Sequence, residues 1–270
     1  MTLGAEAEVC SALMRDIEAG GDARDTAAER LRGAVVRWSF HPAGCRVVQA
    51  ALSLCEGDIA AALASELRGH VRRATESKHA NFVLAKTVEV LPPEQSAFIA
   101  EEILAFAWCA VRHQYGCRIF CRLIEHTSTH PATARLIERE VARVASELSR
   151  HEYAHYVVAH VLEHGLPEHK RAVVASLLNE QLVRVAQNRY GRFVAEALFM
   201  HASAEEQAVA VRVLRRPDIV ELAVHPNAHT AIVAALRSKA TCQDFEREIE
   251  GAISAFAVAS SRLEANKFGL

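Results

Sequence analysis

The sequence predicts an all-α protein in which one helical unit is repeated about six times. Three observations support this fold class: a composition rich in helix-forming residues, a segment that recurs every 36–38 residues, and an apolar stripe with helical spacing in each copy. Hydrophobic residues make up 51% of the 270 residues, with 12 glycines and 7 prolines, which indicates a folded chain. Because no such unit can bury its apolar face alone, we expect the units to stack as an α-solenoid.

The recurring segment has a small residue at its fourth position, followed by a helical pattern. Its copies are "HPAGCRVVQAAL" from His41, "SKHANFVLAKTV" from Ser77, "HQYGCRIFCRLI" from His113, "HEYAHYVVAHVL" from His151, "NRYGRFVAEALF" from Asn188 and "HPNAHTAIVAAL" from His225. The small residues are Gly44, Ala80, Gly116, Ala154, Gly191 and Ala228. Chance does not hold so steady a spacing across six copies.

Each copy carries the stripe of a helix that packs on its neighbours. Counting from the small residue, offsets 3, 4, 7 and 8 are apolar in every copy except at Thr87. Between these helices lies a second amphipathic stretch, such as "PEQSAFIAEEILAFAWCAVRH". Prolines stand where one helix ends and the next begins, at Pro92, Pro93, Pro131 and Pro167. The predicted unit is two main helices and a short turn that leads into the next copy.

The ends of the chain are less regular than its centre. We expect an N-terminal helical cap over residues 1–30, about six repeats over 31–240, and a C-terminal cap or truncated further repeat over 241–270. The last five residues, "NKFGL", look like the start of a seventh copy. This favours a chain that was cut there or an incomplete gene model over a degenerate cap.

Composition and motifs exclude several classes of function. The formal net charge of −2 gives no strong overall field for nucleic acid or an acidic membrane, so any basic surface must be local. Seven cysteines without a CxxC pair favour a reducing compartment, and no secretory signal or membrane span is apparent. No GxSxG, Walker or HExxH motif occurs, so we expect no enzyme, no catalytic residue and no cofactor.

A second set of positions lies opposite the packing stripe, at offsets 1, 2 and 5 from the small residue. Offset 2 holds a flat guanidinium or aromatic group in five of six copies: Arg46, Phe82, Arg118, Tyr156 and Phe193, with Thr230 in the last. Flat side chains at one-repeat spacing suit stacking between bases of a single strand, worth ~1–3 kcal/mol per base. Offsets 1 and 5 could then address base edges; they hold Cys45 and Gln49, Asn81 and Ala85, Cys117 and Cys121, His155 and Ala159, Arg192 and Glu196, and His229 and Val233.

The repeat resembles the Pumilio (PUF) repeat, in which each unit addresses one RNA base with residues of one helix. The similarity rests on stretches such as "HPAGCRVVQAAL", "HQYGCRIF" and "HEYAHYVVAHVLEHGLPEHK" and spans about residues 31–237. It implies a right-handed, armadillo-like α-solenoid, a short array resembling the last six of the usual eight repeats. It also implies RNA that runs antiparallel to the repeats.

The edge positions depart from the family pattern in five of the six copies. In the family, Cys or Ser with Gln implies adenine, Asn with Gln uracil, and Ser with Glu guanine. Only Cys45 with Gln49 is a full match, which implies adenine near the 3′ end of the bound segment. Arg192 with Glu196 keeps the Glu but not its small partner, and the two could pair with each other. Each lost bidentate partner removes ~1–3 kcal/mol of base discrimination, so we expect weak or altered sequence specificity.

Two further groups of residues have a functional and a structural interpretation. Lys86, Arg122 and His160 follow the last edge position in the central copies and could contact phosphates, or could simply be solvated helix positions. His113, Cys117 and Cys121 have one-turn spacing, but the same offsets hold other residue types elsewhere. We therefore interpret them as repeat positions and expect no metal site.

The favoured function is binding of single-stranded RNA, from an mRNA 3′ region or another RNA, in post-transcriptional regulation. The alternative is a helical-repeat scaffold that binds proteins without RNA recognition, because helical solenoids often do so. Neutral net charge and incomplete edge pairs favour the scaffold, and the row of flat side chains favours RNA. We expect a cytoplasmic protein with no membrane attachment, with a nuclear or nucleolar location left open.

Overall fold

The computed structural model describes residues 3–178, 181–215 and 219–238, together with 245, 247, 249–251 and 254. Every element within this described part is helical, as the sequence predicts. The chain forms two compact units, one ending at Glu140 and the other beginning at Val141. Among the residues that the structure describes, none of the helices has the length and apolar character needed to cross a bilayer.

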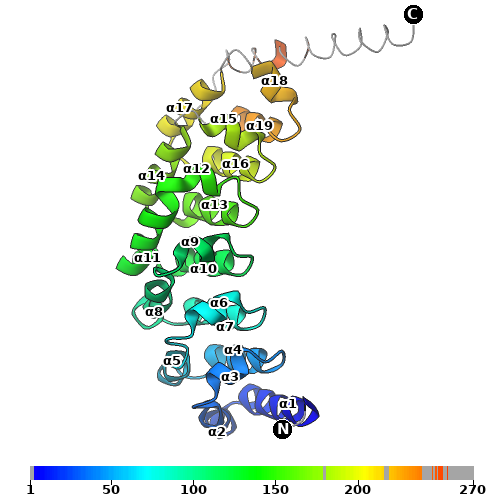
Figure 1. Ribbon diagram of the computed structural model, residues 1–270, viewed down its shortest axis with the longest axis vertical. Coiled ribbons are helices and arrows are strands. Elements are labelled where there is room, and N and C mark those ends of the chain that lie inside the picture. The colour runs from blue at the N-terminus through cyan, green and yellow to red at the C-terminus, as the bar shows by residue number, and fades with distance from the viewer. Residues whose placement is uncertain are drawn as a thin grey trace, which may run out of the picture. The chain divides into compact units, whose positions relative to one another are not determined.

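The first unit holds two N-terminal helices and three repeats (Figure 1). Its helices are α1 (Leu3–Ala19), α2 (Gly21–Leu31), α3 (Val35–Ser39), α4 (Gly44–Leu54), α5 (Gly57–Ser65), α6 (Val71–Glu76), α7 (Ala80–Val90), α8 (Pro93–Ile103), α9 (Ala107–Arg112), α10 (Gly116–Thr127) and α11 (Pro131–Leu136). Each repeat consists of a short first helix, a second helix and a third helix, for example α3, α4 and α5. The second helix α7 packs between α4 and α10.

The second unit continues the same pattern of first, second and third helices. A π-helical turn (Ile137–Val141) leads into a 3-10 turn (Ala142–Val144), α12 (Ala145–Leu148), α13 (Ala154–His164), α14 (Pro167–Leu178), α15 (Gln181–Gln187), α16 (Gly191–His201), α17 (Ala204–Leu214), α18 (Ile219–Val224) and α19 (His229–Arg237). Here the second helix α16 packs between α13 and α19. The sequence predicts two main helices and a short turn in each repeat. The structure corrects this prediction, because the turn is a short helix and each of the first five repeats has three helices.

The predicted apolar stripe is the core of both units. Every stripe residue is buried except Leu236, which is half-buried. The exception to the apolar pattern, Thr87, is also buried, and its hydroxyl donates to the Val83 carbonyl at 2.9 Å. A buried hydroxyl with a hydrogen-bond partner avoids most of the desolvation cost, which explains how Thr fits this position.

Close approach to the preceding short helix explains the small residue at the start of each second helix. A Cβ on Gly116 would lie 2.1 Å from the Ala110 carbonyl oxygen, and one on Gly191 would lie 2.2 Å from that of Val185. Both distances are far inside van der Waals contact.

The two ends of the chain differ in how far the structure describes them. The N-terminal segment is helical, as α1 and α2. The "NKFGL" segment and most of the expected C-terminal cap lie outside the described residues.

Candidate functional site

The five flat side chains at offset 2 are all exposed on second helices. In the first unit they are Arg46, Phe82 and Arg118, on the successive helices α4, α7 and α10; in the second unit they are Tyr156 on α13 and Phe193 on α16. The exposed fractions of the three aromatic residues are 45% for Phe82, 54% for Tyr156 and 44% for Phe193. Exposed aromatic rings of this size are unusual as packing residues, which is consistent with a surface that contacts a ligand.

The side chains at offset 1 are mostly buried, and they contact backbone carbonyls in the segment just before their helix. Cys45, Asn81, Cys117 and His155 are each at most 4% exposed. The Asn81 amide donates to the Ser77 carbonyl at 2.7 Å. The thiols of Cys45 and Cys117 point at backbone carbonyls at 3.4 and 3.6 Å.

The remaining offset-1 residues are more open. Arg192 is half-buried and His229 is exposed. The Nδ1 atom of His229 contacts the His225 carbonyl at 3.1 Å. The Arg192 guanidinium lies over the Phe193 ring, 4.5 Å from its centroid. The structure thus corrects the suggestion that Arg192 pairs with Glu196, because within the described residues the guanidinium stacks on Phe193 and forms no ion pair with Glu196.

The offset-5 residues differ in what they can offer a ligand. Gln49 is half-buried, and its amide donates to the Cys45 carbonyl at 2.9 Å. Its second N–H and its carbonyl oxygen are left for a base edge. Cys121 is 6% exposed, and burial raises the pKa of its thiol far above the usual range. A protonated buried thiol is a poor metal ligand, and burial also raises the pKa of Cys117.

His155 forms the centre of an aromatic cluster in the second unit. Its ring centroid lies 3.9 Å from that of Tyr156, and it stacks on Tyr190 and Phe193 at 5.4 and 5.8 Å. Its Nδ1 contacts the His151 carbonyl at 3.0 Å, and its buried Nε2 has no hydrogen-bond partner among the described residues. Burial lowers the pKa of His155, so the ring is neutral at physiological pH.

Two of the three predicted phosphate contacts already have acidic partners. Lys86 Nζ lies 2.6 Å from a Glu89 carboxylate oxygen, and Arg122 pairs with Glu125 and, at 3.9 Å, with Glu89. A phosphate would have to compete with these carboxylates. The prediction that Lys86 and Arg122 contact RNA therefore requires that the ion pairs open.

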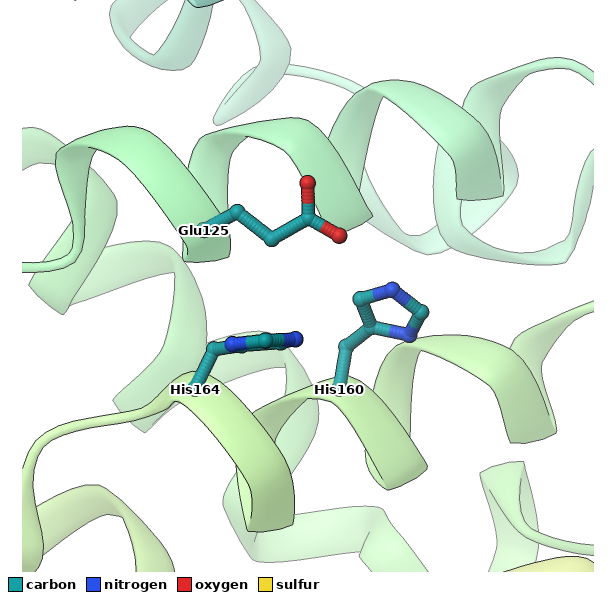
Figure 2. A group of neighbouring side chains, drawn as sticks. All are labelled: Glu125, His160 and His164. Carbon is teal, nitrogen blue, oxygen red and sulfur yellow. The ribbon is translucent and has the colours of Figure 1, made fainter.

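The third predicted phosphate contact, His160, lies one turn from His164 on α13. Figure 2 shows both imidazoles on the same face of that helix, and their ring centroids are 5.6 Å apart. His160 Nδ1 contacts the Tyr156 carbonyl at 3.0 Å. The role of His160 as a phosphate contact stays a prediction.

Sequence reasoning missed a capping position three residues before each small residue. The backbone N–H groups at the start of each second helix donate to a side-chain acceptor there, as when Gly44 donates to His41 Nδ1 at 3.0 Å and Gly191 to Asn188 Oδ1 at 3.1 Å. The acceptors are His41, Ser77, His113, His151, Asn188 and His225. The signal was the recurring His, Ser or Asn that opens each copy, since such residues cap helix N-termini.

Four segments of the chain match a known family of repeats. The sequence profile of the "Pumilio-family RNA binding repeat" matches four segments: residues 35–68, 77–104, 112–138 and 145–178. The chain belongs to the Pumilio repeat family. The four matches cover the repeats whose second helices are α4, α7, α10 and α13.

Curated relatives share this family but are longer proteins. The chain is 26% identical over 180 residues to Fem-3 mRNA-binding factor 2 of Caenorhabditis elegans, which covers 60% of the chain and 28% of that protein. It is 22% identical over 224 residues to a Pumilio domain-containing protein of Schizosaccharomyces pombe, covering 83% of the chain and 33% of the relative. The chain thus spans about a third or less of the length of these relatives.

Solved structures of Pumilio domains share the fold. A Puf3 RNA binding domain bound to a Cox17 RNA 3′ UTR recognition sequence matches with a TM-score of 0.80 and 20% identity, over 92% of this chain and 74% of that one. PUF-8 in complex with PBE-RNA matches with a TM-score of 0.78 and 21% identity, over 94% and 74%. At these identities the likeness shows the fold, which is the Pumilio-type α-solenoid predicted from the repeats.

Proposed function

We propose that this protein binds single-stranded RNA by stacking bases against the flat side chains of its second helices. The observation that carries the proposal is the exposure of Phe82, Tyr156 and Phe193. All three are at offset 2 of a second helix, on the side opposite the buried stripe. Exposed Arg46 and Arg118 extend the set in the first unit. Aromatic and guanidinium planes accept any base, which suits binding of a single strand.

Sequence preference is expected to be weak and concentrated at one repeat. Gln49 retains unused hydrogen-bonding atoms beside Cys45, and this pair implies adenine by resemblance to the family. Asn81 is buried and its amide is bound to the Ser77 carbonyl just before α7, and its partner position holds Ala85. Most other repeats therefore offer stacking without a full pair of edge contacts.

Two RNA-binding relatives guide the proposed biological role. Fem-3 mRNA-binding factor 2 binds an mRNA, and the Puf3 domain is bound to a 3′ UTR sequence. By this likeness we propose that the RNA is an mRNA 3′ region, that the role is post-transcriptional regulation, and that it takes place in the cytoplasm.

A protein-binding scaffold is the second candidate. The observation that favours it is the exposure of two apolar side chains in the second unit, Met200 at 65% and Val233 at 39%. Both line an open pocket formed by α16, α17 and α19. Exposed apolar side chains around a pocket also suit a protein partner. RNA binding is the preferred function because the flat side chains recur at one-repeat spacing.

A selection from random single-stranded RNA at fixed salt tests the proposal. The parent should retain RNA and enrich one adenine near the 3′ end of the bound segment. Gln49→Ala should retain RNA but lose that enrichment, because it removes one of the two edge contacts. Absence of retained RNA above a no-protein control would reject RNA binding and leave the scaffold.

A further inference from the structure

The short first helices of the first unit carry an exposed row of their own, separate from the second helices. Arg37 on α3 and Arg73 on α6 both stand seven residues before the small residue of their copy, and Arg72 on α6 and Trp108 on α9 both stand eight residues before it. All four are exposed, and α3, α6 and α9 lie in successive layers of this unit (Figure 1). Because equivalent positions of stacked repeats face the same way, the four side chains share one surface, which we call the first-helix patch.

Aromatic rings hold two arginines of this patch in place. The Arg73 guanidinium lies 4.7 Å from the centroid of the Phe40 ring, at the end of α3 in the preceding repeat. The Arg72 guanidinium lies 5.6 Å from the ring centroid of Phe106, at the start of α9 in the following repeat. A guanidinium held against a ring loses less conformational freedom when it binds, and its in-plane N–H groups remain to donate to a carboxylate.

The segment that carries α6 has more positive charge than its own acids balance. Residues 67–78 include one acid, Glu76, and four basic residues: Arg68, Arg72, Arg73 and Lys78. Arg72 meets Glu76 only at 3.8 Å, and because both side chains are exposed the pair contributes little. Arg73 forms no ion pair with any residue in the part of the chain that the structure describes. The formal charge of the whole chain is −2, so this positive excess is local and attracts an acidic ligand to this surface.

Trp108 gives the patch an apolar anchor on α9. Its side chain is 45% exposed, and the Arg112 guanidinium covers one face of the ring, 3.2 Å from the centroid. The equivalent positions of the two preceding repeats hold Val36 and Arg72, so no row of aromatic rings is available here for successive bases of RNA. Tryptophan and arginine are the residue types that dominate the binding energy of protein–protein interfaces, which favours a protein as the ligand.

We propose that the first-helix patch binds an acidic, extended segment of a partner protein, with carboxylates on Arg72 and Arg73 and one apolar side chain against Trp108. Three helices at a spacing of about 8–10 Å cover about 16–20 Å, the length of about five to six extended residues. A short linear segment is therefore long enough to cross the patch. This inference does not rest on the proposed RNA binding, because the flat side chains of that proposal lie on the second helices.

Selection from a phage-displayed library of random dodecapeptides against the whole chain tests the proposal. The enriched peptides should combine several Asp or Glu residues with a Leu, Phe or Trp. The most enriched peptide is then synthesised with a fluorescent label and titrated by anisotropy. Absence of any enriched sequence, or enrichment only of sequences without an excess of acids, would overturn the proposal.

Variants identify the surface that binds the labelled peptide. Arg73→Glu should weaken binding about tenfold or more, because it places a carboxylate against the acidic peptide. Trp108→Ala should also weaken binding about tenfold, as expected for a tryptophan anchor, and it decides the question if Arg73→Glu does not fold. Arg171→Glu makes the same change of charge at an exposed arginine of α14, in the second unit, and should bind like the parent.

Unchanged peptide affinity in Trp108→Ala and Arg73→Glu, or an equal loss in Arg171→Glu, would overturn the assignment of the patch. An oligouridine dodecamer distinguishes a protein ligand from RNA, and its affinity should be the same in all variants as in the parent. A loss of oligouridine affinity in Arg73→Glu and Trp108→Ala alone would assign the patch to RNA and overturn the proposal. If oligouridine does not bind the parent, the proposed RNA binding fails, while the peptide titrations still decide this inference.

Discussion

The carboxylate of Glu66 accepts a hydrogen bond from the backbone N–H of Gly33, at 2.7 Å, and so joins the end of the first repeat to its beginning. Its other oxygen accepts from Val35 at 3.1 Å. Glu102 repeats the arrangement with Gly69 at 2.7 Å and Val71 at 3.4 Å. Gly33 and Gly69 have φ of +70° and +77°, the left-handed region that favours glycine. A carboxylate at the end of the third helix of a repeat therefore caps the short first helix of the same repeat.

Glu102→Ala should lower the free energy of unfolding by about 1–2 kcal/mol, because it leaves two backbone N–H groups without their charged acceptor. Urea denaturation followed by circular dichroism measures this. Glu101→Ala is the matched control, since Glu101 is the exposed neighbour on the same helix. Equal effects of the two substitutions would show that the cap adds no stability.

The sequence predicts the core of this protein better than its polar contacts. The apolar stripe follows from helical periodicity alone, and the structure buries it as expected, including Thr87. The short first helices, such as α3, have five to seven residues in most repeats and are too short for periodicity to reveal. The Glu66 cap joins residues 33 positions apart, which no local pattern indicates.

Helical periodicity also predicts part of the candidate surface. Offset 2 lies opposite the stripe, and its exposure follows from helix geometry at Phe82 and Tyr156. The burial of His155 does not follow, because it depends on rings contributed by a neighbouring repeat, Tyr190 and Phe193. The hydrogen bond from the Asn81 side chain to the Ser77 carbonyl likewise does not follow from the sequence pattern.

His113→Ala should destabilise the protein by about 0.5–2 kcal/mol, as expected for loss of a helix N-cap. In the structure the Tyr115 N–H donates to His113 Nδ1 at 3.2 Å. His113→Asn should retain most of the stability, because Asn188 fills the same role in the fifth repeat. Thermal unfolding of the three proteins checks this, and an Asn variant as unstable as the Ala variant would contradict the capping role.

Acidification should destabilise the protein in part through His155. Burial lowers the pKa of this ring in the folded state, so the unfolded chain binds a proton at a higher pH than the folded protein does. Stability is therefore retained above the ordinary histidine pKa of about 6.5 and falls as the pH drops below it. Between about pH 7.5 and pH 5.5, the melting temperature of His155→Gln should fall less than that of the parent.

The control for this pH dependence is His126→Gln, which alters an exposed histidine. Its melting temperature should follow that of the parent as the pH falls. A His155→Gln profile parallel to that of the parent would show that His155 does not contribute to acid sensitivity.

The most direct test of RNA binding by stacking is a titration of labelled single-stranded RNAs of unrelated sequence with the parent, Tyr156→Ala and Trp108→Ala. Tyr156 and Trp108 are both exposed aromatic residues, but Trp108 lies on the short helix α9 and not on a second helix. Tyr156→Ala should weaken binding to every sequence by ~1–3 kcal/mol, while Trp108→Ala binds like the parent. Unchanged RNA affinity in Tyr156→Ala, together with loss of a protein partner in a pull-down, would contradict RNA stacking and establish the scaffold in its place.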